Sequence, residues 1–202
     1  MQIKFSRIEI RDLSRAWFFV SIAFAIVLSG GIFGIGQAHF LQSFIIAAIA
    51  VGTGFLLHEM GHKIVAQRYG CFAEFRADMS MLILAVFISF LGFVFAAPGA
   101  VMIMGHVSKE KYGKISLAGP LVNIVLALLF LAAFVFLSPL GLLGNIFSYG
   151  FIINTWLALF NMLPFWVLDG KKVLAWSRTV YFCTIGFAVL LLILGYVLPL
   201  GL

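Results

Sequence analysis

Long apolar runs dominate this chain, and charged residues fall mostly in the short stretches between them. A helix needs about 20 apolar residues to cross a hydrocarbon core about 30 Å thick. We therefore predict five to six membrane segments joined by short connections, with no sizeable soluble domain. The candidate segments cover residues 16–36, 41–66, 81–104, 115–137, 146–168 and 179–200.

The composition supports a polytopic membrane protein. Hydrophobic residues make up 64% of the 202 positions and charged residues 10%, and the mean hydropathy is +1.18. Soluble domains carry about 25% charged residues. Segment 16–36 follows a basic stretch, as in a secretory signal, but it lacks a small-residue cleavage site, so we expect it to remain as a span. The expected fold is an all-α polytopic membrane protein, with one transmembrane domain over residues 1–202.

The distribution of charge predicts the orientation of the spans. Connections 30–40 and 138–149 contain no Lys, Arg, Asp or Glu. By the positive-inside rule, the N-terminal segment 1–15 and the other charge-bearing connections are cytoplasmic. The same rule explains the net charge of +6 without a nucleic-acid partner. Lys and Arg occur in stretches 1–15, 63–76, 109–114 and 171–178.

Segment 81–104 lies between two charge-bearing connections, so it should enter and leave the membrane on one face. Ala97-Pro98-Gly99 interrupts its helical pattern, and AVMIM at 100–104 is β-prone. A strand advances about 3.3 Å per residue and a helix 1.5 Å, so a short extended return can match a longer helical descent. We predict a re-entrant segment over 81–106. Hydropathy alone also permits a full crossing.

The second segment ends in HEMGH at residues 58–62, which places His58 and His62 one helical turn apart on one face. Two such histidines can bind one Zn²⁺, with Glu59 beside the metal-bound water. The alternative is a pair of hydrogen-bonded core histidines with an interfacial glutamate. Ionisable groups inside a membrane segment are functional candidates, and three in this register favour the metal.

A catalytic zinc ion commonly has three protein ligands, so one more is needed. Asp169 ends a long apolar run in which Pro164 can interrupt the helix and Gly170 can allow a turn. It could equally cap a helix or pair with Lys171 as an interfacial anion. The other candidates lie in connections, where solvated roles or the far face are expected: His39, Glu74, Asp78, His106 and Glu110.

Three stretches together resemble the site-2 protease family of intramembrane zinc metalloproteases. They are HEMGH with its continuation KIVAQRYG at 58–70, AGPLVN at 118–123 and FNMLPFWVLDG at 160–170. The family pattern has an Asn eight residues before the Asp of its Asp-Gly pair, as Asn161 precedes Asp169 here. HExxH alone is moderately specific, but all three stretches in this order are strongly specific.

The resemblance implies that His58, His62 and Asp169 bind one Zn²⁺ per chain and that Glu59 is the general base. Asn161 would help to stabilise the oxyanion, although an Asn in a membrane helix can also hold neighbouring helices together through hydrogen bonds. Asn123 is assigned to that structural role. The implied reaction is hydrolysis of a peptide bond within or near the transmembrane segment of a membrane-protein substrate, as in regulated intramembrane proteolysis.

The resemblance also bears on topology, since one zinc ion can bind all three ligands only if 81–104 doubles back. Relatives have membrane-embedded β structure after the zinc helix, and we expect the stretch 99–104 to pair with an unwound substrate strand. We expect the protein to lie in a prokaryotic cell membrane, in contact with the lipid bilayer. A catalytically silent relative that binds membrane proteins, or a metal-binding transporter, are the alternatives.

The chain departs from the family pattern in two places. Val167 stands where many members have a second proline, and Lys171 and Lys172 follow the Asp-Gly pair. Both changes affect the expected shape of the loop and leave the ligand spacing intact. No PDZ or CBS domain is expected, so substrate selection would rest on the membrane core or on other proteins.

Overall fold

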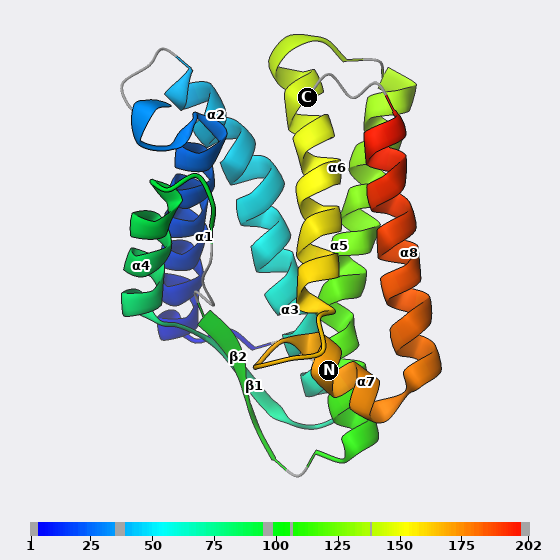
Figure 1. Ribbon diagram of the computed structural model, residues 1–202. Helices are drawn as coiled ribbons and strands as arrows, with labels where there is room; N and C mark the ends of the chain where they lie inside the picture. The colour runs from blue at the N-terminus through cyan, green and yellow to red at the C-terminus, as the bar shows by residue number, and fades with distance from the viewer. Residues whose placement is uncertain (1–3, 35–38, 95–98, 106, 138, 199–202) are drawn as a thin grey trace.

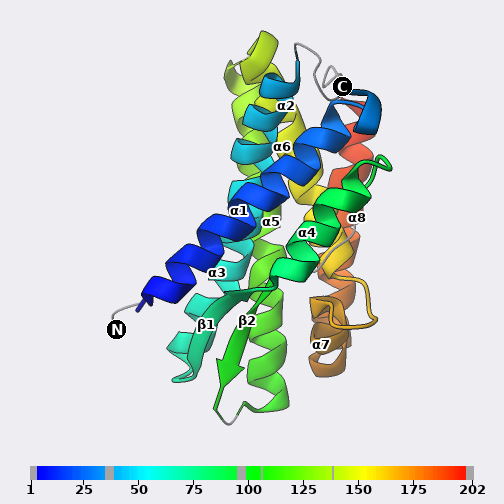
Figure 2. The same ribbon diagram turned by 90° about the vertical axis from the view of Figure 1, so that its left-hand side faces the viewer.

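The computed structural model describes residues 4–34, 39–94, 99–105, 107–137 and 139–198. Figures 1 and 2 show that the helices lie in two groups, with α1 and α4 on one side and α3, α5, α6 and α8 on the other. A small sheet and the short helix α7 lie toward one end of the molecule. In chain order the elements are α1 (Arg7–Leu28), the 3₁₀ turn η1 (Gly31–Gly34), α2 (Phe40–Ile46), the π-helical segment η2 (Ala47–Gly52), α3 (Thr53–Arg68), β1 (Phe72–Ala77), α4 (Met79–Ser89), β2 (Gly99–Met104), α5 (Lys109–Leu137), α6 (Gly141–Asn161), α7 (Asp169–Trp176) and α8 (Arg178–Val197).

Among the described residues, four helices are long and apolar enough to cross a membrane, which confirms the all-α polytopic fold. They are the continuous helix Phe40–Arg68, formed by α2, η2 and α3, together with α5, α6 and α8. Helix α1 has 22 residues. Its first half is rich in charge, so only the part from Ala16 onward is apolar.

The predicted span 146–168 ends earlier than expected. Helix α6 stops at Asn161, and residues 162–168 form bends and turns before α7 begins. Pro164 lies in this irregular stretch, where its ring and missing N–H exclude a continuing helix. The apolar character of residues 162–168 therefore belongs to a loop rather than to a membrane helix.

The segment between β1 and β2 doubles back on itself, and its re-entry into a membrane stays a prediction. Helix α4 has 11 residues and is about 16 Å long at 1.5 Å per residue, too short to cross. Strand β2 then pairs antiparallel with β1, and Ala77 faces Gly99 in the register. The start and end of the intervening segment therefore lie side by side. Residues 97 and 98, where we expected the break, lie outside the described residues.

Helix α3 packs closely against its neighbouring helices at positions where it has glycine. Helix α5 packs against α3, α6 and α7. A Cβ on Gly61 would lie 3.0 Å from the carbonyl oxygen of Ala118. A Cβ on Gly54 would lie 2.4 Å from the side-chain oxygen of Asn154. Small residues at membrane helix interfaces permit such close approach, and they bring polar groups of α5 and α6 onto α3.

Candidate metal centre

Two histidines of α3 and one aspartate of α7 direct their ligand atoms to a common point. His58 Nε2 lies 3.0 Å from His62 Nε2. Asp169 Oδ2 lies 3.4 Å from His58 Nε2 and 3.0 Å from His62 Nε2. All three residues are buried, and they form a group that could hold a metal ion. The structure thus brings together residues 111 positions apart in sequence, His58 and Asp169.

Local helix geometry explains how each ligand is placed. His58 and His62 are four residues apart in α3, so their side chains lie one above the other on one face. Asp169 is the first residue of α7, and Gly170 follows it. A Cβ on Gly170 would lie 2.0 Å from the carbonyl oxygen of Met162. The absence of a side chain at Gly170 therefore lets α7 start against the end of α6, which brings Asp169 to α3.

The other ring nitrogen of each histidine is held by an acceptor from α5. His58 Nδ1 lies 2.5 Å from Asn123 Oδ1, and His62 Nδ1 lies 2.8 Å from the carbonyl oxygen of Ile115. With Nδ1–H donating to these oxygens, each Nε2 presents its lone pair toward Asp169. Such partners fix the tautomer and the ring orientation of metal-binding histidines.

Asn123 is itself fixed by a buried amide network. Its Nδ2 donates to the carbonyl oxygen of Gly54 at 3.3 Å and to Asn154 Oδ1 at 3.0 Å. Asn154 in turn donates to the carbonyl oxygens of Ala50 and Gly150, at 3.0 and 2.9 Å. These bonds assign the oxygen of Asn123 to His58. The structural role predicted for Asn123 therefore includes the orientation of a ligand, which its sequence position did not indicate.

The three ligands fit zinc. Tetrahedral Zn²⁺ with bonds of about 2.0–2.2 Å places its ligand atoms roughly 3.3–3.6 Å apart. The three separations here are 3.0, 3.0 and 3.4 Å, so a small outward shift would accommodate the ion. Two neutral imidazoles and one carboxylate are a ligand set typical of catalytic zinc, with one position left for water or substrate.

Asp169 carries its negative charge at this site. Burial alone would raise the pKa of the Asp169 carboxyl, but protonated imidazoles at His62 and His58 outweigh that effect and hold the pKa well below its usual range. With both imidazoles neutral, a bound metal cation would supply the compensating positive charge instead. Its second oxygen, Oδ1, lies 3.5 Å from Lys172 Nζ. We expected Lys171 as the alternative partner of an interfacial Asp169. The lysine near Asp169 is Lys172, and it leaves Oδ2 to the histidines.

A cavity of about 320 Å³ adjoins the three ligands. Glu59 is buried and lines this cavity together with Val101 of β2. Asn161 also lines the cavity, and its Nδ2 donates to the carbonyl oxygen of Leu157 at 2.9 Å. Glu59, Asn161 and the three ligand residues therefore border one space.

The other ligand candidates have different roles. Asp78 caps α4 by accepting from the N–H groups of Ser80 and Met81. Glu74 pairs with Arg76, and Glu110 with Lys114. His39 lies nineteen residues before His58, at the start of the same helix, and so is about 28 Å away at 1.5 Å per residue. His106 lies outside the described residues.

Gly119 is a site residue whose role the sequence did not reveal. A Cβ there would lie 2.5 Å from His62 Nε2 and 2.6 Å from His58 Nε2. The glycine in AGPLVN therefore leaves room for both imidazoles against α5. The signal in the sequence is its place beside Pro120 in AGPLVN, one of the three stretches that carry the family resemblance.

We expect Gly119→Ala to lower zinc affinity, because the added methyl group must displace both histidine rings. Changes to groups that orient zinc ligands typically cost 10–100-fold in affinity, and we expect about that loss. Competition with a chelator would measure it. Gly186→Ala is the matched control, since a Cβ at Gly186 meets nothing within 4 Å in helix α8. Equal zinc affinity in the two variants would contradict the assigned role of Gly119.

Comparison with known proteins found two similar proteins, both from Methanocaldococcus jannaschii. One carries the name "putative zinc metalloprotease" and is 42% identical over 180 residues, which cover 88% of this chain and 89% of that protein. The other, named "zinc metalloprotease", is 29% identical over 120 residues, 59% of this chain and 30% of that protein. No protein-family model and no solved structure matches the chain. These names and the His-His-Asp group agree on zinc as the cofactor.

Proposed function

This chain belongs to the zinc metalloprotease family of the first of these relatives, and from that membership we propose that it is an intramembrane protease of the site-2 type. It hydrolyses a peptide bond within or near the transmembrane segment of a membrane-protein substrate. One observation carries this proposal. Two of the three zinc-ligand candidates, His58 and His62, lie within the candidate span Phe40–Arg68, beside a cavity.

The depth of the site supports a substrate inside the bilayer. His58 lies ten residues before Arg68, the last residue of α3, and so about 15 Å from that end at 1.5 Å per residue. A helix that crosses the hydrocarbon core is about 30 Å long. A peptide bond that reaches His58 from the lipid would therefore come from a membrane segment that has locally unwound.

In this proposal, the three residues whose ligand atoms converge are the metal ligands. His58, His62 and Asp169 hold the metal, and their bonds to Asn123, Ile115 and Lys172 keep the ligand atoms oriented. Zinc, when bound, supplies Lewis-acid chemistry that activates water and polarises a carbonyl group.

Glu59 handles the protons of the reaction. Its carboxylate takes a proton from the attacking water as the water oxygen bonds to the carbonyl carbon. It then gives that proton to the leaving nitrogen as the C–N bond breaks. Asn161 keeps one amide N–H beyond the bond to Leu157, because a primary amide has two donors, and this N–H can face the carbonyl oxygen.

The free edge of β2 is the proposed binding site for the substrate strand. The N–H of Phe75 on β1 donates to Glu9 Oε1, and the carbonyl oxygen of Ala73 accepts from Gln67, so both groups point away from β2. In an antiparallel ladder, the directly opposite residues then also point outward. These are Val101 and Ile103.

Val101 and Ile103 line the cavity together with Glu59. No strand pairs with this edge of β2 in the part of the chain that the structure describes. An extended substrate segment could therefore add to the sheet beside the metal ligands, which is the β-augmentation mode of peptide recognition.

The proposed orientation places the N-terminus in the cytoplasm of a prokaryotic cell. The start of α1, the sheet and α7 lie toward the same end of the molecule in both views (Figures 1 and 2). The described parts of all four basic stretches fall in these elements or beside them, since Lys114 lies over Trp176 of α7. The described parts of the uncharged connections lie toward the other end. The positive-inside rule assigns the basic end to the cytoplasm.

Cleavage of a single-span membrane protein tests the proposal. The zinc-loaded protein would be reconstituted in vesicles with substrates whose spans contain helix-weakening Gly or Pro, and mass spectrometry would locate the new ends. We expect a cut inside or beside the span, lost after zinc removal. A stable complex with intact substrate would favour the catalytically silent alternative. Zinc uptake into vesicles without any cleavage would favour the transporter.

A further inference from the structure

One face of α3 carries three polar residues at intervals of four: Glu59, Lys63 and Gln67. Residues at this spacing lie one above another along a helix. Glu59 borders the same cavity as Val101 of β2, and Gln67 Nε2 donates to the carbonyl oxygen of Ala73 at 3.2 Å. The first and last members of this stripe thus lie against the sheet. Lys63, between them, contacts the N-terminal helix instead.

Lys63 forms a buried ion pair with Glu9 of α1. Lys63 Nζ lies 2.5 Å from Glu9 Oε2, and both side chains are fully buried. Lys63 Nζ also donates to the carbonyl oxygen of Lys4 at 2.7 Å and lies 3.8 Å from the ring centroid of Phe5. Desolvation of two charges is costly, so a buried pair is weak evidence of a contribution to stability. Its geometry suggests a different contribution.

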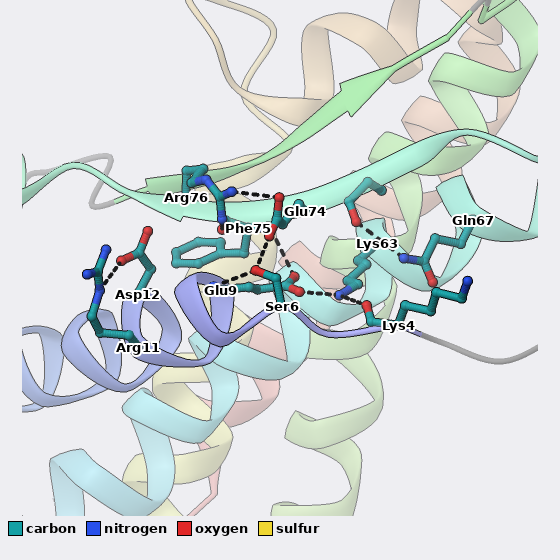
Figure 3. Close-up of polar contacts among 11 residues, drawn as sticks. Lys4, Ser6, Glu9, Arg11, Asp12, Lys63, Gln67, Glu74, Phe75 and Arg76 are labelled. Atoms are coloured by element: carbon teal, nitrogen blue, oxygen red, sulfur yellow. Dashed lines mark hydrogen bonds and ion pairs between the residues drawn. The ribbon is translucent and has the colours of Figure 1, made fainter.

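Glu9 connects the ion pair to the sheet. Figure 3 shows its carboxylate between Lys63 and β1, with Phe75 beside it. Glu9 Oε1 accepts the N–H of Phe75 at 3.0 Å, while Oε2 binds Lys63. One carboxylate therefore holds a group of α3 and a backbone group of β1 at the same time.

These contacts connect α1, the sheet and α3. Phe75 lies opposite Val101 in the register of the sheet, and Val101 borders the cavity that Glu59 also lines. Glu59 lies one helical turn before Lys63, which binds Glu9. The position of β2 relative to Glu59 is therefore tied to the bond between Glu9 and Phe75. The sequence-based interpretation treated Lys63 only as a cation of a cytoplasmic connection.

We propose that Glu9 is a positioning residue for proteolysis, which sets the place of the β2 edge relative to Glu59 and the metal ligands. This inference rests on the proposed function. A strand advances about 3.3 Å per residue, so a displacement of that size along the edge would present a neighbouring peptide bond for cleavage. Glu9 thereby determines which bond of the substrate strand is cut, without touching the substrate.

The test removes the connection without leaving a buried charge. In the double variant Glu9→Met/Lys63→Met, two side chains of similar length fill the same space, and such replacement of a buried ion pair is often neutral for folding. The Phe75 N–H loses its acceptor. Asp12→Asn is the matched control, because Asp12 is a buried carboxylate of the same helix that pairs with Arg11.

Two measurements are made on the reconstituted proteins after zinc analysis. Hydrogen exchange of the β1 peptide should be faster in the double variant, by about fivefold for one lost net hydrogen bond. Cleavage should spread to neighbouring peptide bonds, and KM should rise more than kcat falls, with zinc content unchanged. Asp12→Asn should match wild type in both measurements. A purely structural role would lower zinc content and yield without moving the cleavage position.

The reversed pair Glu9→Lys/Lys63→Glu separates the ion pair from the bond to β1, since lysine has no acceptor for the Phe75 N–H. This variant should still show faster hydrogen exchange of the β1 peptide and cleavage at neighbouring peptide bonds. Wild-type behaviour of the reversed pair, or of a zinc-loaded double variant, would overturn the inference. Absence of cleavage by wild type would instead refute the proposed function, and the exchange measurement would still test whether Glu9 holds β1.

Discussion

Glu59→Gln should abolish cleavage while the protein keeps its zinc. Glutamine has nearly the same shape as glutamate but cannot take a proton from water, and a positioned general base contributes about 10²–10⁴-fold to a rate. We therefore expect cleavage of a single-span substrate to fall by about that factor. Metal analysis should still give one zinc ion per chain, because His58, His62 and Asp169 are untouched.

The control for this variant is Glu110→Gln, which neutralises an exposed glutamate paired with Lys114 at the start of α5. It should cleave as wild type does. Product formation over time, followed by mass spectrometry, gives the rates, and plasma emission spectroscopy gives the zinc content. Equal cleavage by Glu59→Gln and wild type would refute Glu59 as the base. Loss of zinc from Glu59→Gln would show instead that Glu59 supports the metal centre.

Val101→Pro should lower cleavage about 10–100-fold without removing zinc. Such a loss is expected when an interaction worth about 1.4–2.8 kcal/mol is removed from the bound substrate. Proline removes the outward N–H at the edge of β2. It leaves the pairing with β1 intact, because Val101 and Phe75 form a pair without mutual hydrogen bonds. Proline is accepted at such edge positions.

Two further variants separate the possible causes. Val101→Ala keeps the backbone N–H and shortens the side chain, so it should cleave at close to the wild-type rate. Ile103→Pro removes another outward N–H two residues farther along β2, and it should also impair cleavage. Normal turnover by both proline variants would refute substrate pairing with β2. Impairment in Val101→Pro alone would assign the effect to the cavity wall at Val101 rather than to strand pairing.

The candidate metal ligands show how much of the site follows from local sequence. The interval of four residues in HEMGH places His58 and His62 on one helical face before any tertiary contact forms. Asp169 could be associated with them from the residues alone only as one of several candidates. Its identity as the third member depends on the turn from α6 to α7 and on the absence of a side chain at Gly170.

For the residues around the candidate ligands, the role depends even more on tertiary packing. Asn123 and Asn154 are ordinary interior amides in a sequence, and only the packing of α5 and α6 against α3 connects them to His58. Gly119 is one glycine among 20 in the chain. Its importance becomes visible only when the imidazoles lie against α5.

The sequence by itself determined that the chain is a polytopic helical membrane protein and that two histidines share a helical face. Its charge pattern also predicted that segment 81–104 returns to the side it came from, while hydropathy alone permitted a full crossing. These features depend on hydropathy, helical period and charge between neighbouring segments, all of which are local. Only the tertiary structure decided that Glu9 meets Lys63, that β1 pairs with β2 in its observed register, and that the free edge of β2 borders the same cavity as Glu59. Such contacts join residues far apart along the chain, and their energies depend on the packing of whole helices rather than on any short pattern.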